Sequence, residues 1–188
     1  MERLEQTGKT YYVSGKKIAA RKKTNNKWFE TQDQIGYWDD FSKPKIVWAE
    51  TMRIKKKHCE RFPRFSHINQ DFFTDKTCFM ANGKALKFLL AVLNSLIGRY
   101  QFSQTVAMMD NGGYLMQKIY VEQIRICPSD EKIRKAIVGL VDALLETNTA
   151  ETEALEKQID AAVAKEFGLS NDEQAYLCEM LSKPLGRR

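Results

Sequence analysis

Residues 53–65 combine basic and aromatic side chains in a pattern that suits contact with nucleic acid. Lysine and arginine neutralise phosphates, which supplies affinity that does not depend on base sequence, and arginine also pairs bidentately with guanine in the major groove. We interpret the cations as phosphate contacts, and Phe62 and Phe65 as core anchors that point inward. The alternative is a surface loop whose charges are merely solvated. The candidate phosphate contacts are Arg53, Lys55, Lys56, Lys57, Arg61 and Arg64.

A second polar stretch spans residues 99–113 and ends at the turn signal Gly112-Gly113. Its amide side chains are of a type that reads adenine, because an amide matches the donor and the acceptor that adenine presents in the major groove. For any single residue, a polar loop without a ligand is an equally good interpretation. The candidate base-reading side chains are Arg99, Gln101, Gln104 and Asn111.

The sequence carries no recognisable catalytic constellation. It has no glycine-rich cofactor loop after a strand, no Asn/Asp-Pro-Pro-Tyr/Phe motif, no Walker loop and no GxSxG elbow. His58, Cys59 and His67 could act as metal ligands, but their spacing fits no common zinc pattern and no fourth ligand is evident. We therefore predict a non-catalytic chain with no metal site and no cofactor of its own.

Charge is unevenly distributed along the sequence. Residues 1–128 contain 22 Lys and Arg against 12 Asp and Glu, a formal charge of +10, whereas residues 129–188 contain 8 against 12, a formal charge of −4. The first part of the chain should therefore be attracted to a polyanion, with Arg21, Lys22 and Lys23 adding non-specific attraction. A solvated basic surface without a partner is the alternative.

Bulk composition narrows the class of protein. A hydrophobic content of 43% and a charged content of 29% are those of an ordinary globular protein. No apolar run approaches the ~20 residues that a membrane span needs, and no apolar signal segment follows the basic N-terminus. We therefore expect a cytoplasmic protein without a membrane partner.

Residues 83–100 have the pattern of a helix that is buried over most of its surface. Their apolar residues recur at steps of three and four, and only a narrow stripe of polar or small residues interrupts them. We predict a core helix with Asn82 as its N-cap, a sheet on one side, and a close-packed neighbour against the stripe. The stripe consists of Lys84, Lys87, Ala91, Asn94, Ser95 and Gly98.

The elements around this helix follow from simpler patterns. Alternating apolar residues predict short strands at residues 44–50, 77–80 and 114–121. The sequence therefore predicts a mixed α+β fold, in which a small mixed β-sheet packs on the buried helix 83–100 and a C-terminal helical bundle follows.

Beyond Pro128 the apolar residues recur at helical spacing. Three helices are expected: one opened by Ser129, one over residues 151–167 that ends before Gly168, and one to about residue 182 opened by the capping box Ser170-Asn-Asp-Glu173. The change of pattern and of charge divides the chain into residues 1–128, the part that would bind nucleic acid, and residues 129–188, a helical region.

Residues Leu90-Ala-Val-Leu-Asn-Ser-Leu-Ile97 resemble the LLALLNS helix of the target-recognition domain in type IIG restriction–modification enzymes. Related domains occur in adenine-N6 DNA methyltransferases and in type I specificity subunits. Other segments resemble that family in the same order along the chain. They are the KPKIVW-E strand at residues 41–50, the stretch before the core helix at residues 69–72 and 78–80, the closing I-PIP strand at residues 120–128, and the terminal helix at residues 155–169.

This resemblance implies sequence-specific recognition of duplex DNA for a restriction–modification enzyme. The chain would position an adenine-N6 methyltransferase, or a nuclease, located elsewhere, and S-adenosylmethionine and Mg²⁺ would belong to those other domains. In the family, the recognition domain continues upstream of the part that corresponds to residues 1–34, so the resemblance also implies a C-terminal fragment whose Met1 lies inside or just before that domain. Because the family reads DNA through variable loops, no residue-by-residue assignment of base contacts follows.

The partners that the resemblance implies are double-stranded DNA and a methyltransferase domain or subunit. Homodimerisation through the C-terminal helices is a further hypothesis. Two other classes of function stay open: a protein-interaction or assembly module of the same system with no DNA affinity of its own, and an RNA-binding domain that prefers single strands through exposed aromatic residues.

Overall fold

The computed structural model describes residues 10–13, 15–19, 37–53, 62–109, 113–128, 130–147 and 151–182. Its contacts divide the chain into two compact units, Met1–Asp40 and Phe41–Arg188. In the first unit, β1 (Thr10–Val13) and β2 (Lys16–Ala19) pair antiparallel as a hairpin. A short 3-10 helix, η1, spans Trp38–Ser42. The division that we predicted after Pro128 lies inside the second unit, and as a division of function it stays a prediction.

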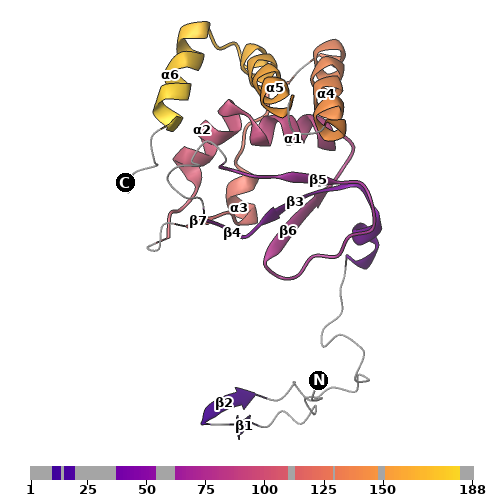
Figure 1. The fold of residues 1–188 in the computed structure, drawn as a ribbon, viewed down its shortest axis with the longest axis vertical. Coiled ribbons are helices and arrows are strands. Elements are labelled where there is room, and N and C mark those ends of the chain that lie inside the picture. Colours follow the sequence, from indigo (N-terminus) through magenta and orange to yellow (C-terminus); the bar gives the residue numbers. More distant parts are fainter. Residues whose placement is uncertain are drawn as a thin grey trace. The chain divides into compact units, whose positions relative to one another are not determined.

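A three-stranded sheet forms the base of the second unit (Figure 1). β3 (Lys45–Ala49) lies in the middle and pairs antiparallel with both β5 (Ser66–Ile68) and β6 (Cys78–Asn82). Ile46 and Trp48 are buried, as expected for alternate residues on the inner face of a strand. The first two strands predicted from the sequence are thereby confirmed, whereas β5 is too short to show an alternating pattern.

The predicted core helix is present, but as two helices rather than one. α1 (Leu86–Asn94) packs on the sheet with most of its side chains buried, and α2 (Leu96–Thr105) follows directly after Ser95. α2 therefore extends into the stretch that we interpreted as a polar loop. Asn82 is not the N-cap, because it ends β6 and α1 begins after Ala85 without a side-chain cap.

Ser95 and Gly98 account for the break between the two helices. Ser95 has an extended backbone, and its hydroxyl donates to the Val92 carbonyl (2.8 Å) and accepts from the Gly98 N–H (3.2 Å), so it ends α1 and caps α2. A Cβ at Gly98 would lie 2.3 Å from the Val92 carbonyl oxygen. The first turn of α2 can approach the end of α1 this closely only because residue 98 has no side chain.

A second, two-stranded sheet joins β4 (Thr51–Met52) to β7 (Tyr114–Leu115). The strand predicted over residues 114–121 is wrong beyond β7, because α3 (Lys118–Val121) begins three residues later. Residues 124–128 have no regular structure, so the closing strand that the resemblance implied at residues 120–128 is not formed.

Tertiary contacts of Met116 attach the chain directly after β7 to β3 and its following turn. The Met116 N–H donates to the Glu50 carbonyl (2.7 Å), and the Met116 carbonyl accepts from the indole N–H of Trp48 (2.8 Å). The Met116 side chain is fully buried. The chain is thus attached to β3 and its following turn at this point, and it leaves the strand direction.

Three C-terminal helices follow close to the predicted boundaries. They are α4 (Glu131–Glu146), α5 (Thr152–Glu166) and α6 (Asn171–Ser182). Asp130 caps α4 by accepting the N–H three residues on (2.9 Å), whereas the predicted cap, Ser129, lies outside the described residues. Gly168 follows the end of α5 as predicted and has a positive φ of 74°, and Ser170 and Glu173 exchange the hydrogen bonds of the predicted capping box.

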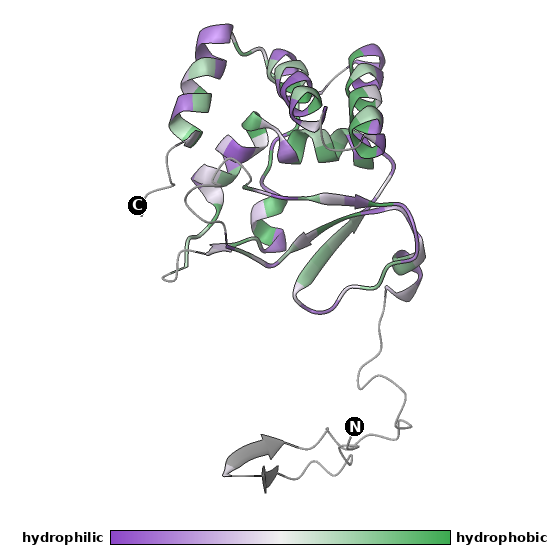
Figure 2. Ribbon diagram, in the orientation of Figure 1, coloured by the Kyte–Doolittle hydropathy of each residue, from purple (hydrophilic) through white to green (hydrophobic). Residues whose placement is uncertain are grey.

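The C-terminal helices cover the side of α1 that faces away from the sheet (Figure 1). α4 and α5 contact α1, and α6 contacts α2. Figure 2 shows hydrophobic residues concentrated along α1 and on the inner sides of its neighbours. One core joins Ile46 of the sheet, Val92 of α1, Val141 of α4 and Val163 of α5. The mixed α+β fold class is confirmed.

No helix within the described ranges combines the length and the apolar character that a membrane crossing requires.

Candidate nucleic-acid interface

The two polar stretches singled out in the sequence meet at one end of the β4–β7 pair. Met52 and Tyr114 are partners in the antiparallel register, so Arg53, which follows Met52, lies beside Gly113, which precedes Tyr114. The basic stretch (residues 53–65) therefore begins at the place where the amide-bearing stretch (residues 99–113) ends. The ring of Phe62 packs on the ring of Tyr114, with centroids 4.2 Å apart. Near its C-terminal end, the basic stretch thus contacts β7 again, through Phe62.

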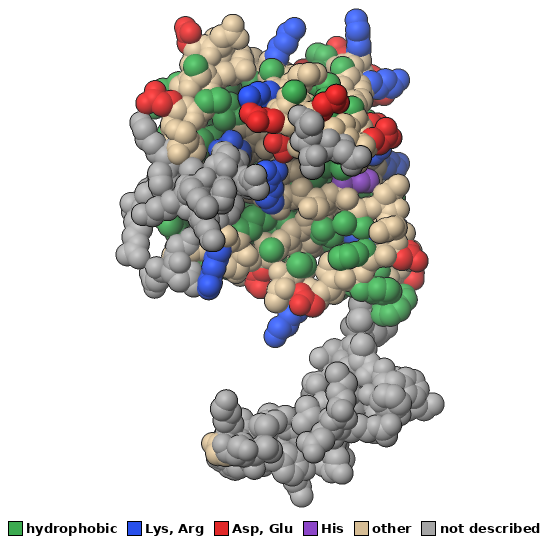
Figure 3. All heavy atoms as spheres, in the orientation of Figure 1, with side chains coloured by type: hydrophobic (Ala, Val, Ile, Leu, Met, Phe, Trp, Pro, Cys, Tyr) green, Lys and Arg blue, Asp and Glu red, His purple; other side chains and the backbone are tan. Residues whose placement is uncertain are grey.

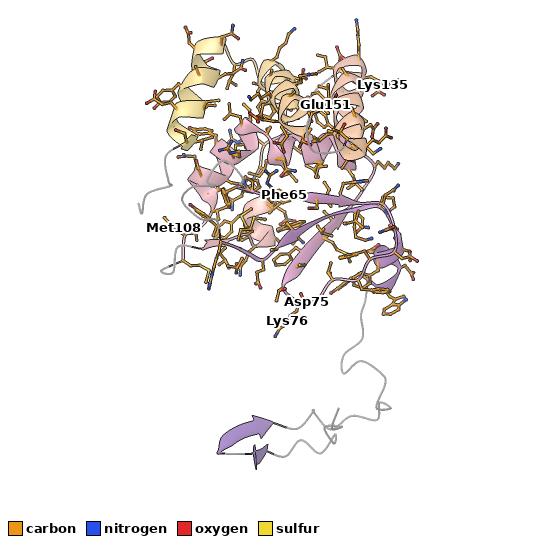
Figure 4. The ribbon with its side chains drawn as sticks, viewed as in Figure 1. Phe65, Asp75, Lys76, Met108, Lys135 and Glu151 are labelled. Carbon is orange, nitrogen blue, oxygen red and sulfur yellow. The ribbon has the colours of Figure 1, made fainter. Side chains whose placement is uncertain are left out.

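The amide-bearing stretch closes on this strand from its other side. Met108 forms an isolated antiparallel bridge with Tyr114, and the Met109 N–H donates to the Gly113 carbonyl (2.7 Å). Figure 4 shows Met108 next to β7. The predicted contacts Lys55, Lys56, Lys57, Arg61 and Asn111 lie outside the described residues, but the described ends of both segments lie together.

Buried aromatic rings hold the C-terminal end of the basic stretch. Phe62 and Phe65 are each 4% exposed, which confirms that they point inward. Phe65 lies near the centre of the second unit (Figure 4), with its ring 5.5 Å from Trp48 on one side and 5.5 Å from Phe102 on the other. Arg64, between the two phenylalanines, is exposed. The predicted alternation of inward rings and an outward cation is confirmed here.

Asn94, the last residue of α1, fixes the backbone at this point. Its side-chain oxygen accepts from the Phe65 N–H (3.0 Å), and its side-chain amide donates to the Phe65 carbonyl (2.9 Å). The spacing of residues 83–100 assigned Asn94 only to the stripe of polar or small residues on the predicted core helix, and did not predict this role. The signal that could have found it is an amide at the end of an otherwise apolar helix, directly before the capping Ser95.

A pocket of about 290 Å³ lies between residues 63–67, the α1–α2 junction and helices α4 and α5. Arg64 from the basic stretch and Arg99 from the amide-bearing stretch both line it. Two carboxylates of α5, Glu156 and Asp160, also line it. One nitrogen of the Arg64 guanidinium lies 3.3 Å from a Glu156 carboxylate oxygen. Arg64, which we predicted to bind phosphate, and Arg99, which we predicted to read bases, therefore line a pocket together with carboxylates of the acidic part of the chain.

The two carboxylates of the pocket differ in how firmly they are held. Asp160 accepts the Leu96 N–H at 2.7 Å, and so satisfies a donor in the first turn of α2. Burial raises the pKa of the Asp160 carboxyl, while the Leu96 N–H and the positive charge of Arg99 oppose that rise. Glu156 contacts the pocket through its ion pair with Arg64, and 43% of its side chain is exposed.

His67 adds no positive charge to the pocket at neutral pH. Burial lowers its pKa, and the nearby positive charge of Lys87 lowers it further, against a smaller opposing contribution from Asp142. Lys87 and Asp142 form an ion pair with each other. The cations that line the pocket are thus the two arginines.

The remaining predicted contacts have mixed surroundings. Gln101 grips the backbone of Arg125, donating to its carbonyl (3.1 Å) and accepting from its N–H (2.8 Å). Both ends of this amide are engaged within the chain, which favours a structural role. Gln104 is exposed and donates to the Ser103 hydroxyl (3.0 Å), and Arg53 is exposed at the end of β4.

On the far side of the core, α1, β6 and residues 118–126 enclose an apolar groove of about 330 Å³. Its lining includes Phe79 and Met80 of β6 and Leu89 of α1. Among the strands that the structure describes, β6 has a partner on one edge only. Figure 3 shows apolar side chains exposed over the sheet, and mixed cations and carboxylates over the helices.

The described part of the chain holds no group of three or more His, Cys, Asp or Glu placed to bind a metal ion. His67 lies in this part, whereas His58 and Cys59 lie outside it. The sequence matches no family model and no curated protein.

Proposed function

We propose that this chain recognises a short duplex DNA sequence for a restriction–modification enzyme. It would position an adenine-N6 methyltransferase, or a nuclease, that lies on another domain or subunit, and it would be inert alone. The family resemblance of residues 90–97 and of the segments around them supports the proposal. S-adenosylmethionine and Mg²⁺ would act in those partner domains.

The observation that carries the proposal is the convergence of the two polar stretches on the β4–β7 pair. Phosphate contacts and base contacts must lie on one surface if they are to engage the same duplex. Arg53 and Gly113 are neighbours at the end of this pair, and Phe62 returns the basic stretch to Tyr114. The described ends of the two stretches thus lie together at this pair.

The charge distribution supports the same interpretation. The formal charge of +10 in residues 1–128 supplies the long-range attraction that non-specific DNA binding requires. The inward anchoring of Phe62 and Phe65 leaves the intervening Arg64 at the surface. A segment anchored by buried rings can present cations without a large loss of backbone entropy on binding.

Selection of bound duplexes from a random pool tests the proposal. The full 188-residue chain should enrich one short motif, and its affinity for that motif should fall steeply with salt. Replacing Lys55, Lys56 and Lys57 by Ala should weaken binding to all sequences and reduce the salt slope by about 3, since each lost phosphate contact removes about one counterion.

A variant with Lys132, Lys135 and Lys157 replaced by Ala is the matched control. These lysines are exposed on α4 and α5, and the change in net charge is the same. The control should keep most of the wild-type salt slope. Enrichment of no motif, or equal losses in the two triple variants, would count against sequence-specific recognition through residues 53–65.

A protein-interaction module of the same system is the second candidate. The apolar groove that β6 helps to line and the edge position of β6 among the described strands favour it, because a strand edge near apolar pockets is a common site for an added peptide strand. Such a module would show no salt-dependent affinity for duplex DNA. The binding titration that tests the first candidate therefore also separates the two.

A further inference from the structure

The pocket between residues 63–67 and α5 joins the two stretches that we assign to DNA. Arg64 and Arg99 belong to different stretches, are 35 positions apart in the sequence, and line the same cavity of about 290 Å³. A pair of guanidinium groups on one cavity suits an oxyanion, because each guanidinium presents several donors in a planar fork.

The backbone that carries Arg64 is held more firmly than its side chain. Asn94 binds both the N–H and the carbonyl of the neighbouring Phe65, and the Phe65 ring is buried. The Arg64 side chain is 48% exposed and has one short contact, to Glu156. The guanidinium can therefore turn toward a new partner without disturbing the core.

Glu156 is an exchangeable partner for Arg64. The shortest distance between them is 3.3 Å, and both side chains are more than 40% exposed. Solvent-exposed ion pairs of this kind contribute little net stability, because water screens them and ordering two long side chains costs entropy. A backbone phosphate of DNA carries one negative charge, like a carboxylate, and also accepts two parallel N–H bonds from arginine. The second cation at the pocket, Arg99, and the release of counterions from the duplex favour the exchange.

Asp160 plays a different part at the same pocket. It is bound to the Leu96 N–H at 2.7 Å and is held at the start of α2. The positive charge of Arg99, which lines the same pocket, acts on the Asp160 carboxyl and opposes the rise of its pKa. Asp160 is thus held by the backbone of α2, whereas Glu156 is paired with Arg64.

We propose that this pocket binds a backbone phosphate of duplex DNA, which replaces Glu156 on Arg64 while Arg99 supplies a second cation. The inference rests on the proposed function and names one phosphate contact within it. Glu156 then acts as an internal competitor for the phosphate. It holds Arg64 at the pocket in the free protein, and it lowers the affinity for DNA by the amount needed to displace it.

Glu156→Gln tests the competition, and Glu153→Gln is its matched control. Glu153 lies on the same helix and pairs with Lys157 on the exposed side, so the control makes the same change in net charge away from the pocket. At about 0.1 M salt, Glu156→Gln should tighten duplex binding about two- to fivefold, the range that a released surface ion pair allows. Glu153→Gln should change binding much less.

Arg64→Ala completes a double-mutant cycle. It should weaken duplex binding and lower the salt slope by about 1, as expected for the loss of one phosphate contact. In the Arg64→Ala background, Glu156→Gln should no longer tighten binding. Urea denaturation of all variants, each expected to match the wild type, ensures that folding does not account for the differences.

The outcomes separate this inference from the proposed function. A wild-type chain that shows no salt-dependent duplex binding overturns both. If the wild type binds DNA but Glu156→Gln and Glu153→Gln tighten binding equally, the effect comes from net charge alone. The proposal that the pocket binds a phosphate is then wrong. An Arg64→Ala chain with wild-type affinity and salt slope also overturns the pocket, while the function proposed for residues 53–65 stands.

Discussion

Lys45 and Arg64 are both cations of the basic part of the chain, and the structure gives them opposite surroundings. Lys45 is fully buried at the start of β3, where its ammonium group donates to the carbonyls of Phe41 (2.8 Å) and Gln70 (3.2 Å). Arg64 lies at the mouth of a pocket, with 48% of its side chain exposed, against an exposed carboxylate. Lys45 joins two segments of backbone, whereas Arg64 has a partner that another anion can replace.

The same contrast divides the amide side chains. Asn94 and Gln101 each hydrogen-bond to the N–H and the carbonyl of one backbone residue, through the oxygen and the nitrogen of the side-chain amide. Gln104 is exposed, and its amide donates to the neighbouring Ser103. Residue type therefore does not distinguish a polar group that holds the fold from one that can meet a ligand. Burial and the identity of the partner distinguish them.

Removing the buried cation should produce the largest loss of stability. Lys45→Met keeps most of the side-chain volume but removes both hydrogen bonds of the buried ammonium group, to the carbonyls of Phe41 and Gln70, so the free energy of unfolding should fall by about 2–4 kcal/mol. Urea denaturation measures the change. Lys76→Met, on the exposed loop before β6 (Figure 4), should leave stability within about 0.5 kcal/mol. Equal effects of the two substitutions would break the distinction between buried and exposed cations.

The α1–α2 junction, which lines the pocket, offers the next test. Gly98→Ala places a Cβ against the Val92 and Leu93 carbonyl oxygens, at 2.3 and 2.6 Å, and should cost about 2–3 kcal/mol because backbone must move. Gly139→Ala, in α4, meets no atom within 4 Å and should instead stabilise the chain by about 0.5–1 kcal/mol. Thermal unfolding of both variants gives the comparison. A tolerated Gly98→Ala would contradict the close approach of the two helices.

The two glutamines of α2 should separate structure from recognition. Gln101→Ala removes two hydrogen bonds to Arg125 and should lower stability by about 1 kcal/mol. Gln104→Ala should change stability by less than about 0.5 kcal/mol, and any effect should appear in the enriched DNA motif. Denaturation and duplex selection on the same two variants measure both effects. A Gln101 variant of unchanged stability would contradict the structural role of Gln101.

The smallest expected effect is a pH dependence from Asp160. Its pKa is raised above the ordinary value of 3.8, mainly by burial, so the folded chain binds this proton more tightly than the unfolded chain. The Asp160 contribution to stability therefore decreases as the pH rises from the unfolded pKa through the folded pKa, and is constant above it. Asp160→Asn keeps an oxygen for the Leu96 N–H and abolishes this dependence. In urea denaturation, the stability of the Asp160→Asn variant relative to the wild type should increase as the pH rises over that range. A stability difference that does not depend on pH would contradict the prediction.

Much of the local structure could be predicted from short sequence patterns. The three C-terminal helices, the capping box at Ser170 and the strand at residues 44–50 follow from spacing and from residues that satisfy backbone groups locally. The inward position of Phe62 and Phe65 followed from their size and polarity alone. These features depend on neighbours within a few residues, which the sequence displays directly.

The errors occur where distant residues act on the backbone. The core helix breaks before Leu96, whose N–H donates to Asp160 of α5. The strand expected over residues 114–121 stops near Met116, which binds Trp48 and Glu50, and α3 follows. The candidate site shows the same limit. Residue types alone suggested Arg64 and Gln101 as similar contacts, but one is half exposed and the other holds a backbone segment.

By itself the sequence determined that this chain folds as an apolar helix with a small sheet and a helical tail, and that its cations cluster before residue 129. Hydrophobic spacing and charge are properties of the chain as written, so folding does not alter them. Only the tertiary structure decided that the two polar stretches meet at the β4–β7 pair, and that α5 brings carboxylates to Arg64 and Arg99. Those neighbours are set by packing between segments far apart in the chain, which no local pattern encodes.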